Sequence, residues 1–353
     1  MSLTCDIVHG YDDFRLTAQF QLGRGITAVF GPSGAGKTTL LNAISGTLQP
    51  DQGTISFQQS TLFDAASKTH LPLHKRRIGR VFQKAMLFPH LSVRQNLTYG
   101  GGSPEAVARI TGVLGISHLL DRRPATLSGG EQQRVAIGRA VLAGSELLLM
   151  DEPLSSLDMA RKAEILPYFR KIHLETQVPI LYVSHDLEEI KQLADDLIIL
   201  EAGQVLHHGP IFDSFQNAEL VRLLGHSGAG SFVTARLMCH HPDGLSELQL
   251  SQTTILLPQV DAPLGTSIRL QINLSDVILS LEAPQMLSAL NAMPVEVTNI
   301  HLGTGPGAIV TLRSGADVVL ARITKRSLAA MGLVVGTKCY AVVKSMAIAP
   351  GRS

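Results

Sequence analysis

A glycine-rich run that ends in lysine and threonine is the clearest chemical signal in the chain. Residues 31–38 match the phosphate-binding pattern G-x-x-x-x-G-K-[ST]. Glycines let backbone N–H groups turn inward and hold an anion at the start of a helix. Lys37 would reach the β- and γ-phosphates of a nucleoside triphosphate, and the Thr38 hydroxyl would hold Mg²⁺. We therefore expect the nucleotide to bind Gly31, Pro32, Ser33, Gly34, Ala35, Gly36, Lys37, Thr38 and Thr39.

Two acidic residues follow the apolar run 147–150. Open α/β sheets bind their ligands at the carboxyl ends of strands, which is where these two acids would lie. Asp151 would bind Mg²⁺, and Glu152 would be the general base that polarises the attacking water, a role worth ~10²–10⁴-fold in rate. A strand that simply meets solvent gives the same pattern, but the phosphate loop in the same domain favours catalysis.

A second pair of glycines lies just before a predicted helix. Ser128 is a good N-cap residue, and Gly129 and Gly130 free backbone N–H groups at the positive end of the helix. One nucleotide has no use for two phosphate-binding surfaces from the same chain. We therefore expect a dimer, in which each subunit presents this run to the γ-phosphate held by Lys37 of the other.

The elements around these runs alternate between strand and helix patterns, which favours a mixed α/β domain with a buried, largely parallel sheet. Residues 60–77 are expected to form a loop, and residues 86–127 lack a β signal and form a helical insert. The expected strands are 26–30, 53–57, 78–82, 147–150 and 180–183, the expected helices are 131–143, 159–176 and 187–194, and a hairpin is expected near 201–204.

The character of the sequence changes near residues 226–231, which we interpret as a linker. From 232 to 353 there are about ten short β-like runs with turn residues between them, a pattern typical of a small barrel or sandwich. The segment 283–290 separates two halves of this region. The predicted organisation is an ATPase domain at 1–228, a β-rich connecting half at 229–288 and a terminal domain at 289–353.

The run Leu127-Ser-Gly-Gly-Glu-Gln132, taken with the two motifs above, resembles the signature of ATP-binding cassette (ABC) ATPases over residues 1 to about 225. The resemblance implies a P-loop NTPase cassette with ATP and Mg²⁺ as cofactors. It implies that Gln83 touches Mg²⁺ and the helical insert, that His185 contacts the γ-phosphate as a second catalytic residue, and that an aromatic residue stacks on adenine. That aromatic is Tyr11 or Phe14, with Tyr11 preferred by position. Across the dimer, the contacts to ATP would come from Ser128, Gly129, Gly130, Gln132 and Asp158.

A cassette followed by about 120 residues of β structure resembles the ATPase subunits of bacterial binding-protein-dependent importers. The terminal runs at 295–300, 318–327 and 340–345 are similar to a molbindin-type, OB-like all-β domain, which implies molybdate as the cargo. Lys325 and Ser327 could offer an oxyanion a cation and a hydroxyl, although an exposed Lys-Arg pair on a barrel loop is an equal interpretation. Molbindins usually carry arginine where this chain has Leu290.

The resemblance also implies partners: a second cassette, membrane-embedded permease subunits and, through the complex, a periplasmic or extracellular oxyanion-binding protein. The location would be peripheral, on the cytoplasmic face of the bacterial inner membrane. Two alternatives stay open, namely an importer for sulfate, tungstate or iron, and an oxyanion-sensing regulatory ATPase.

Composition agrees with this assignment. The 353 residues carry a formal net charge of +1, which argues against nucleic acid as an electrostatic target. No secretory pattern opens the sequence, and no apolar run approaches the ~18 residues of a membrane span. The isolated cysteines Cys5, Cys239 and Cys339 fit a reducing compartment. Neither they nor the pairs His207-His208 and His240-His241 show metal-ligand spacing.

Overall fold

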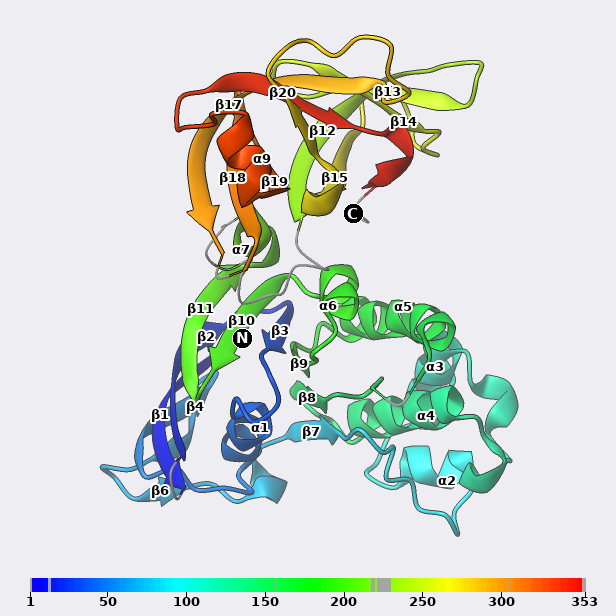
Figure 1. The fold of residues 1–353 in the computed structure, drawn as a ribbon. Helices are drawn as coiled ribbons and strands as arrows, with labels where there is room; N and C mark the ends of the chain where they lie inside the picture. Colours follow the sequence, from blue (N-terminus) through cyan, green and yellow to red (C-terminus); the bar gives the residue numbers. More distant parts are fainter. Residues whose placement is uncertain are drawn as a thin grey trace. The chain divides into compact units, whose positions relative to one another are not determined.

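The computed structural model describes residues 2–11, 14–155, 157–216, 220, 230–303 and 305–350. Backbone contacts divide the chain into two compact units, Met1–Ile211 and Phe212–Ser353, both drawn in Figure 1. Most of the linker expected at 226–231 lies outside the described residues. The domain boundaries expected after residues 228 and 288 therefore stay predictions.

The first unit is built on one eleven-stranded sheet, with the strand order β6-β5-β4-β1-β2-β11-β10-β3-β9-β8-β7. Its strands are β1 (Leu3–Tyr11), β2 (Phe14–Leu22), β3 (Ile26–Phe30), β4 (Gln52–Phe57), β5 (Ser60–Asp64), β6 (Thr69–His70), β7 (Ile78–Val81), β8 (Leu147–Asp151), β9 (Ile180–Val183), β10 (Asp196–Glu201) and β11 (Gln204–Pro210).

The sheet is mixed rather than largely parallel. From β10 through β3, β9 and β8 to β7 the strands run parallel, whereas β1, β2, β4, β5 and β6 pair antiparallel. The expectation of a loop over 60–77 is wrong, because β5 and β6 form a hairpin there. These strands are five and two residues long, and strands so short give little alternation for a sequence pattern to detect.

Helices cover the parallel part of the sheet (Figure 1). They are α1 (Lys37–Ser45), α2 (Val93–Thr98), α3 (Pro104–Leu114), α4 (Gly129–Leu142), α5 (Met159–Thr176) and α6 (Leu187–Leu193). Residues 82–146, all of them described, contain helices and no strand, as expected of a helical insert. In the part of the chain that the structure describes, no helix is long and apolar enough to cross a membrane.

The strand β8, next to the edge strand β7, shows how the sheet is covered on both faces. Leu148 and Met150 pack into a hydrophobic cluster with α2, α3, α4 and α5, while Leu147 and Leu149 pack into a second cluster that includes the apolar face of α1. All four side chains are fully buried. A parallel strand that is covered on both faces has apolar residues at consecutive positions, as residues 147–150 do. Both layers together fix the carboxyl end of β8, where Asp151 lies.

The second unit consists of two five-stranded sheets, β14-β13-β12-β15-β21 and β16-β20-β17-β18-β19. The helix α7 (Ile211–Gln216) precedes them in the chain, and α9 (Lys325–Ala330) follows β19. The strands are β12 (Gly230–His240), β13 (Leu245–Gln249), β14 (Thr254–Pro258), β15 (Ser267–Asn273), β16 (Ile278–Ser280), β17 (Asn291–Leu302), β18 (Gly307–Ser314), β19 (Asp317–Thr324), β20 (Lys338–Val343) and β21 (Ile348–Pro350).

The halves on either side of residues 283–290 exchange strands. β16, from the first half, pairs with β20, and β21, from the second half, pairs with β15. One hydrophobic cluster draws side chains from both sheets, among them Leu248, Leu270, Val297 and Val310. The two halves therefore share one core.

Candidate nucleotide site

The loop between β3 and α1 has the shape that its glycines predict. Gly34 and Gly36 have φ angles of 81° and 104°, in the region that disfavours side chains. A Cβ atom on Gly31 would collide with the carbonyl oxygen of Leu200, and one on Gly36 would lie 2.8 Å from Phe14 Cζ. Close packing from β2 and β10 therefore leaves room only for glycine at these two positions.

A cavity of about 650 Å³ opens beside this loop. This volume falls within the range usual for small-molecule and cofactor sites. The lining brings together Glu152 from the end of β8 and both candidate aromatics, Tyr11 and Phe14, so the choice of adenine-stacking residue stays open. The other lining residues are His9, Ser33, Gly34, Gly36, Lys37, Thr38, Thr39 and Leu48.

Lys37 is the first residue of α1 and is only 7% exposed. Its ammonium group donates hydrogen bonds to the carbonyl oxygens of Gly31 at 2.8 Å and Pro32 at 2.9 Å. Burial lowers the pKa of Lys37, while the nearby carboxylates of Glu152 and Asp151 act in the opposite direction. A cation held in this partly dry position is ready to contact an anion in the cavity.

Asp151 lies between a hydroxyl group and a guanidinium group. Its Oδ1 atom lies 3.5 Å from the Thr38 hydroxyl, and its Oδ2 atom lies 3.1 Å from Arg80 Nη2. Arg80 also donates to the Asn42 side chain at 2.6 Å. Adjacent oxygen donors of this kind fit Mg²⁺, which prefers carboxylate and hydroxyl ligands. Sequence reasoning missed Arg80, although it is the one charged residue of the strand β7.

Glu152 and His185 come from neighbouring parallel strands. Because β8 pairs with β9 in register, the residues that follow both strands meet at the same edge of the sheet. His185 Nδ1 lies 3.3 Å from Glu152 Oε1. The backbone of Glu152 has a φ angle of 46°, uncommon for a residue with a side chain, and Ser155 Oγ donates to its carbonyl oxygen at 2.9 Å. The two predicted catalytic residues are therefore adjacent.

A buried carboxylate behind His185 was also missed. Glu189, which is 3% exposed, accepts hydrogen bonds from Tyr182 Oη and Ser184 Oγ, each at 2.7 Å. Lys162 of α5 lies 2.8 Å from both Glu189 and Asp186. These bonds hold the turn between β9 and α6, which carries His185. No local pattern marks Glu189 as buried, because Glu188 beside it in the same helix is an acid as well.

The second glycine pair begins a capped helix. Ser128 Oγ accepts from Glu131 N at 3.3 Å, and Ser128 N donates to the Glu131 carboxylate at 2.7 Å, so the two residues form a capping box for α4. Asp158 caps α5 by accepting from Arg161 N at 2.9 Å. Ser156, two residues before Asp158, lies outside the described residues.

Five other predicted ATP contacts line cavities other than the one beside Lys37. Ser128 and Gly130 line a cavity of about 280 Å³ with Arg134 and Arg161. Gln83 lines one of about 370 Å³, whose lining also includes Gly129 and Gln132. Gln132 Nε2 donates to the carbonyl oxygens of Pro124 and Leu127, at 3.1 and 3.2 Å. Within one chain, the structure therefore does not place these residues in the cavity of Lys37.

In the second unit, the proposed oxyanion residues lie on α9 rather than on a barrel loop. Lys325 is the first residue of this helix, and Thr324, its N-cap, accepts from Ser327 N at 2.9 Å. Asn291, the residue after Leu290, is buried; its side chain accepts from the backbone N–H of Leu256 at 2.7 Å and donates to the carbonyl of Leu256 at 2.9 Å. Asn291 therefore joins β17 to β14.

Known proteins resemble the chain over nearly its full length. A family model described as "ABC transporter" matches residues 16–155, and one described as "TOBE domain" matches residues 287–350. The molybdenum import ATP-binding protein ModC of Mesorhizobium japonicum is 43% identical, over 98% of this chain and 95% of its own length. The chain belongs to the family of molybdenum import ATP-binding proteins. ModC of Brucella abortus is 43% identical over 95% of this chain and 94% of its own length. ModC of Paramagnetospirillum magneticum is 40% identical over 99% of this chain and 98% of its own length.

Solved structures similar to this family member cover its cassette. The cbiO1 subunit of Clostridium perfringens, described as part of the cbiONQ ABC transporter complex, superposes with a TM-score of 0.55 at 26% identity, over 63% of this chain and 92% of its own. A crystal structure of a nucleotide-free ATP-binding cassette from an ABC transporter superposes with a TM-score of 0.53 at 26% identity, over 63% of this chain and 98% of its own. The prediction of a P-loop cassette followed by an all-β, OB-like domain is confirmed.

Proposed function

We propose that this chain is the ATP-hydrolysing subunit of a molybdate importer. The observation that carries the proposal is that Lys37, Thr38 and Glu152 line one cavity. Asp151 lies beside Thr38 and His185 lies beside Glu152. The relatives named for molybdenum import, similar over both units, support the choice of cargo.

In the proposed site the loop from Gly31 to Thr39 binds the phosphates of ATP. Lys37 exchanges the carbonyl oxygens of Gly31 and Pro32 for phosphate oxygens. Thr38 and Asp151 would hold Mg²⁺, which would neutralise charge on the phosphates. Gln83, which lines a separate cavity in this structure, would have to move toward the nucleotide to join them. Arg80 keeps the Asp151 carboxylate in place through the ion pair at 3.1 Å.

Hydrolysis then needs an oriented water molecule. Glu152 accepts its proton as the water oxygen attacks the γ-phosphorus, and the bond to the β-phosphate oxygen breaks to give ADP and phosphate. His185, held 3.3 Å from Glu152, orients the carboxylate and contacts the γ-phosphate. The bonds of Glu189 to Tyr182 and Ser184 keep the turn of His185 in position.

Two copies of the chain close on the nucleotides. The partner copy supplies the γ-phosphate contacts from Ser128, Gly129, Gly130, Gln132 and Asp158, and their separation from the Lys37 cavity within one chain supports this arrangement. Closure moves the membrane-embedded permease subunits through Gln83 and the helical insert. The chain would then lie peripherally on the cytoplasmic face of the inner membrane, and a periplasmic oxyanion-binding protein would deliver the cargo.

Uptake of labelled molybdate by cells, with and without excess sulfate, tests the function together with the role of Glu152. We expect Glu152→Gln to bind ATP yet lower steady ATP turnover by ~10²–10⁴-fold and stop uptake. Glu201→Gln, at an exposed position of the same unit, is the matched control and should behave as the native chain. Sulfate should not compete.

Three results would contradict this assignment in different ways. Unchanged turnover in Glu152→Gln would remove its role as the base. Competition by sulfate would assign another cargo to the same ATPase. A native chain that binds ATP without steady turnover would favour the regulatory sensor instead.

A further inference from the structure

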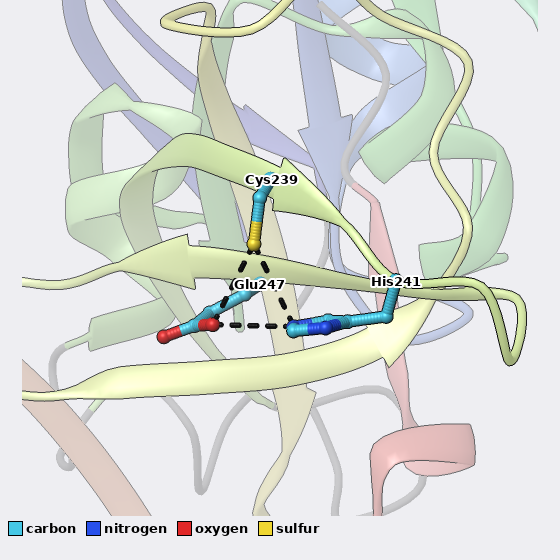
Figure 2. Close-up of side chains that lie close together, drawn as sticks. All are labelled: Cys239, His241 and Glu247. Carbon is cyan, nitrogen blue, oxygen red and sulfur yellow. Dashed lines mark hydrogen bonds and ion pairs between the residues drawn. The ribbon is translucent and has the colours of Figure 1, made fainter.

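Three side chains with metal-binding atoms meet at the end of the β12–β13 hairpin in the second unit (Figure 2). Cys239 Sγ lies 3.6 Å from His241 Nε2 and 3.6 Å from Glu247 Oε2, and these two atoms lie 3.2 Å from each other. Figure 2 shows all three pointing toward one another from the same side of the hairpin. Residue spacing alone gave no sign of this group, because Glu247 comes from the paired strand.

A β-bulge produces the arrangement. Leu237 pairs with Leu248, but the next pair is Cys239 with Glu247, so Met238 is the extra residue on β12. Without the bulge, Met238 would face Glu247. Residues directly opposite on an antiparallel pair point to the same face. His241 lies two residues after Cys239 and therefore shares its face, and its backbone N–H donates to the Leu245 carbonyl at 2.7 Å.

The three distances fit a tetrahedral ion. With metal–sulfur bonds of ~2.3 Å and metal–nitrogen or metal–oxygen bonds of ~2.0–2.1 Å, a tetrahedral angle places sulfur about 3.5 Å from the other two ligands and separates nitrogen from oxygen by about 3.3 Å. The observed values are 3.6, 3.6 and 3.2 Å. Ligands at right angles, as around an octahedral ion, would lie closer together than this.

We propose that Cys239, His241 and Glu247 bind a divalent ion of the zinc class. A thiolate with an imidazole and a carboxylate suits zinc, whereas Mg²⁺ and Ca²⁺ prefer oxygen ligands alone. Three protein ligands leave a fourth tetrahedral position for water. The side chains of His241 and Glu247 are 38% and 31% exposed, so an ion can reach the group from solvent. Binding releases the Cys239 thiol proton to water.

Titration of the full-length chain with Co²⁺, after removal of metals with a chelator, tests the site. Tetrahedral Co²⁺ bound to a thiolate gives a charge-transfer band in the near ultraviolet and visible bands from the metal itself. We expect one equivalent of Co²⁺ to bind and to give both features, and one equivalent of Zn²⁺ to displace it. Cys239→Ser should lose the charge-transfer band. Glu247→Gln should lower the affinity by more than the ~10–100-fold typical of an outer-shell partner.

His240→Gln is the matched control, because His240 lies beside the ligands but contacts Ser246 Oγ, at 2.9 Å. It should keep the band and the affinity. Thermal unfolding without metal checks that every variant folds. A native chain that gives no thiolate band, or a Cys239→Ser variant that keeps the band, would overturn the proposal, since the three groups would then only be hydrogen-bonded neighbours.

Discussion

Asp151 shows at the scale of single residues how this site is prepared. One carboxylate oxygen faces the Thr38 hydroxyl and the other is paired with Arg80, and both members of that ion pair are nearly buried, at 11% and 15% exposure. The guanidinium group therefore fixes the orientation of the carboxylate without blocking the oxygen that faces Thr38. We infer that Arg80 is a positioning residue for the magnesium ligand.

Replacing Arg80 with methionine tests this role. We expect the Mg²⁺ concentration needed for half-maximal ATP hydrolysis to rise by ~10–100-fold, the usual effect of losing an outer-shell partner. Arg77→Met is the control, because its ion pair with Glu146 leaves the arginine side chain 72% exposed and such pairs contribute little. An unchanged Mg²⁺ dependence in Arg80→Met would remove the positioning role.

The sequence could predict those site residues that belong to continuous motifs. The loop from Gly31 to Thr39 and the pair Asp151-Glu152 carry their meaning in neighbouring residues, whereas His185 was predicted only through the resemblance to ABC ATPases. The structure then places it beside Glu152. Arg80 is different, because its partner lies 71 positions away. No local pattern records that distance, so such a residue is found only once the sheet is assembled.

At the scale of elements, α5 secures the turn between β9 and α6. Lys162 contacts both Glu189 and Asp186 at 2.8 Å while its own side chain is 15% exposed. Lys162→Met would leave the buried Glu189 without a cation. We expect a loss of about 3 kcal/mol in the free energy of unfolding at pH 7, the low end for a broken buried pair because Asp186 keeps some solvent contact. Chemical denaturation measures this free energy. Lys75→Met is the control, because Lys75 is exposed.

The same contacts predict how this contribution depends on pH. Burial opposes the charge on Lys162, but the hydrogen bonds with Asp186 and Glu189 outweigh it and raise the pKa of the lysine. A raised pKa means that the stabilisation is complete below the unfolded value of about 10.4 and is lost as pH rises through the folded value. The difference in stability between native and Lys162→Met chains should therefore shrink in strong alkali. A constant difference would contradict this.

The capping box of α4 allows two roles of Ser128 to be separated. Ser128→Ala and Glu131→Ala each remove one of its reciprocal bonds, so each should lower stability by about 1 kcal/mol. Only Ser128→Ala removes the hydroxyl proposed to contact the partner's ATP. In a Glu152→Gln background, ATP-dependent dimerisation should therefore weaken in Ser128→Ala alone. Equal weakening in both variants would assign Ser128 to capping only.

At the scale of the whole molecule, the two units have separate hydrophobic cores. Leu148 belongs to the core of the first unit and Leu270 to that of the second, and both are fully buried. We expect Leu270→Ala to destabilise the second unit by roughly 2–5 kcal/mol and to leave ATP turnover unchanged. Calorimetry should show two unfolding transitions. Leu270→Ala should lower the temperature of one of them, and Leu148→Ala should lower the temperature of the other. A single transition shifted by both variants would mean that the units unfold together.

The all-β character of the second unit was predictable, whereas its strand exchange was not. Turn residues between short β-like runs mark strands wherever their partners lie. The exchanged strands β16 and β21 are three residues long, too short for alternation to indicate a face. Their pairing is decided by the shared core around Leu270 and Val297, which forms only when both halves are present.

This exchange has a consequence for protein synthesis. Every strand of the first unit's sheet lies before residue 211, so this sheet can form while later residues are still being translated. The sheet that begins with β12 at Gly230 gains its edge strand β21 only from residues 348–350. That edge belongs to β15, which ends at Asn273, so the ribosome must deliver the 74 residues from 274 to 347 while the edge is open. The cassette is therefore the part of the chain ready to work first.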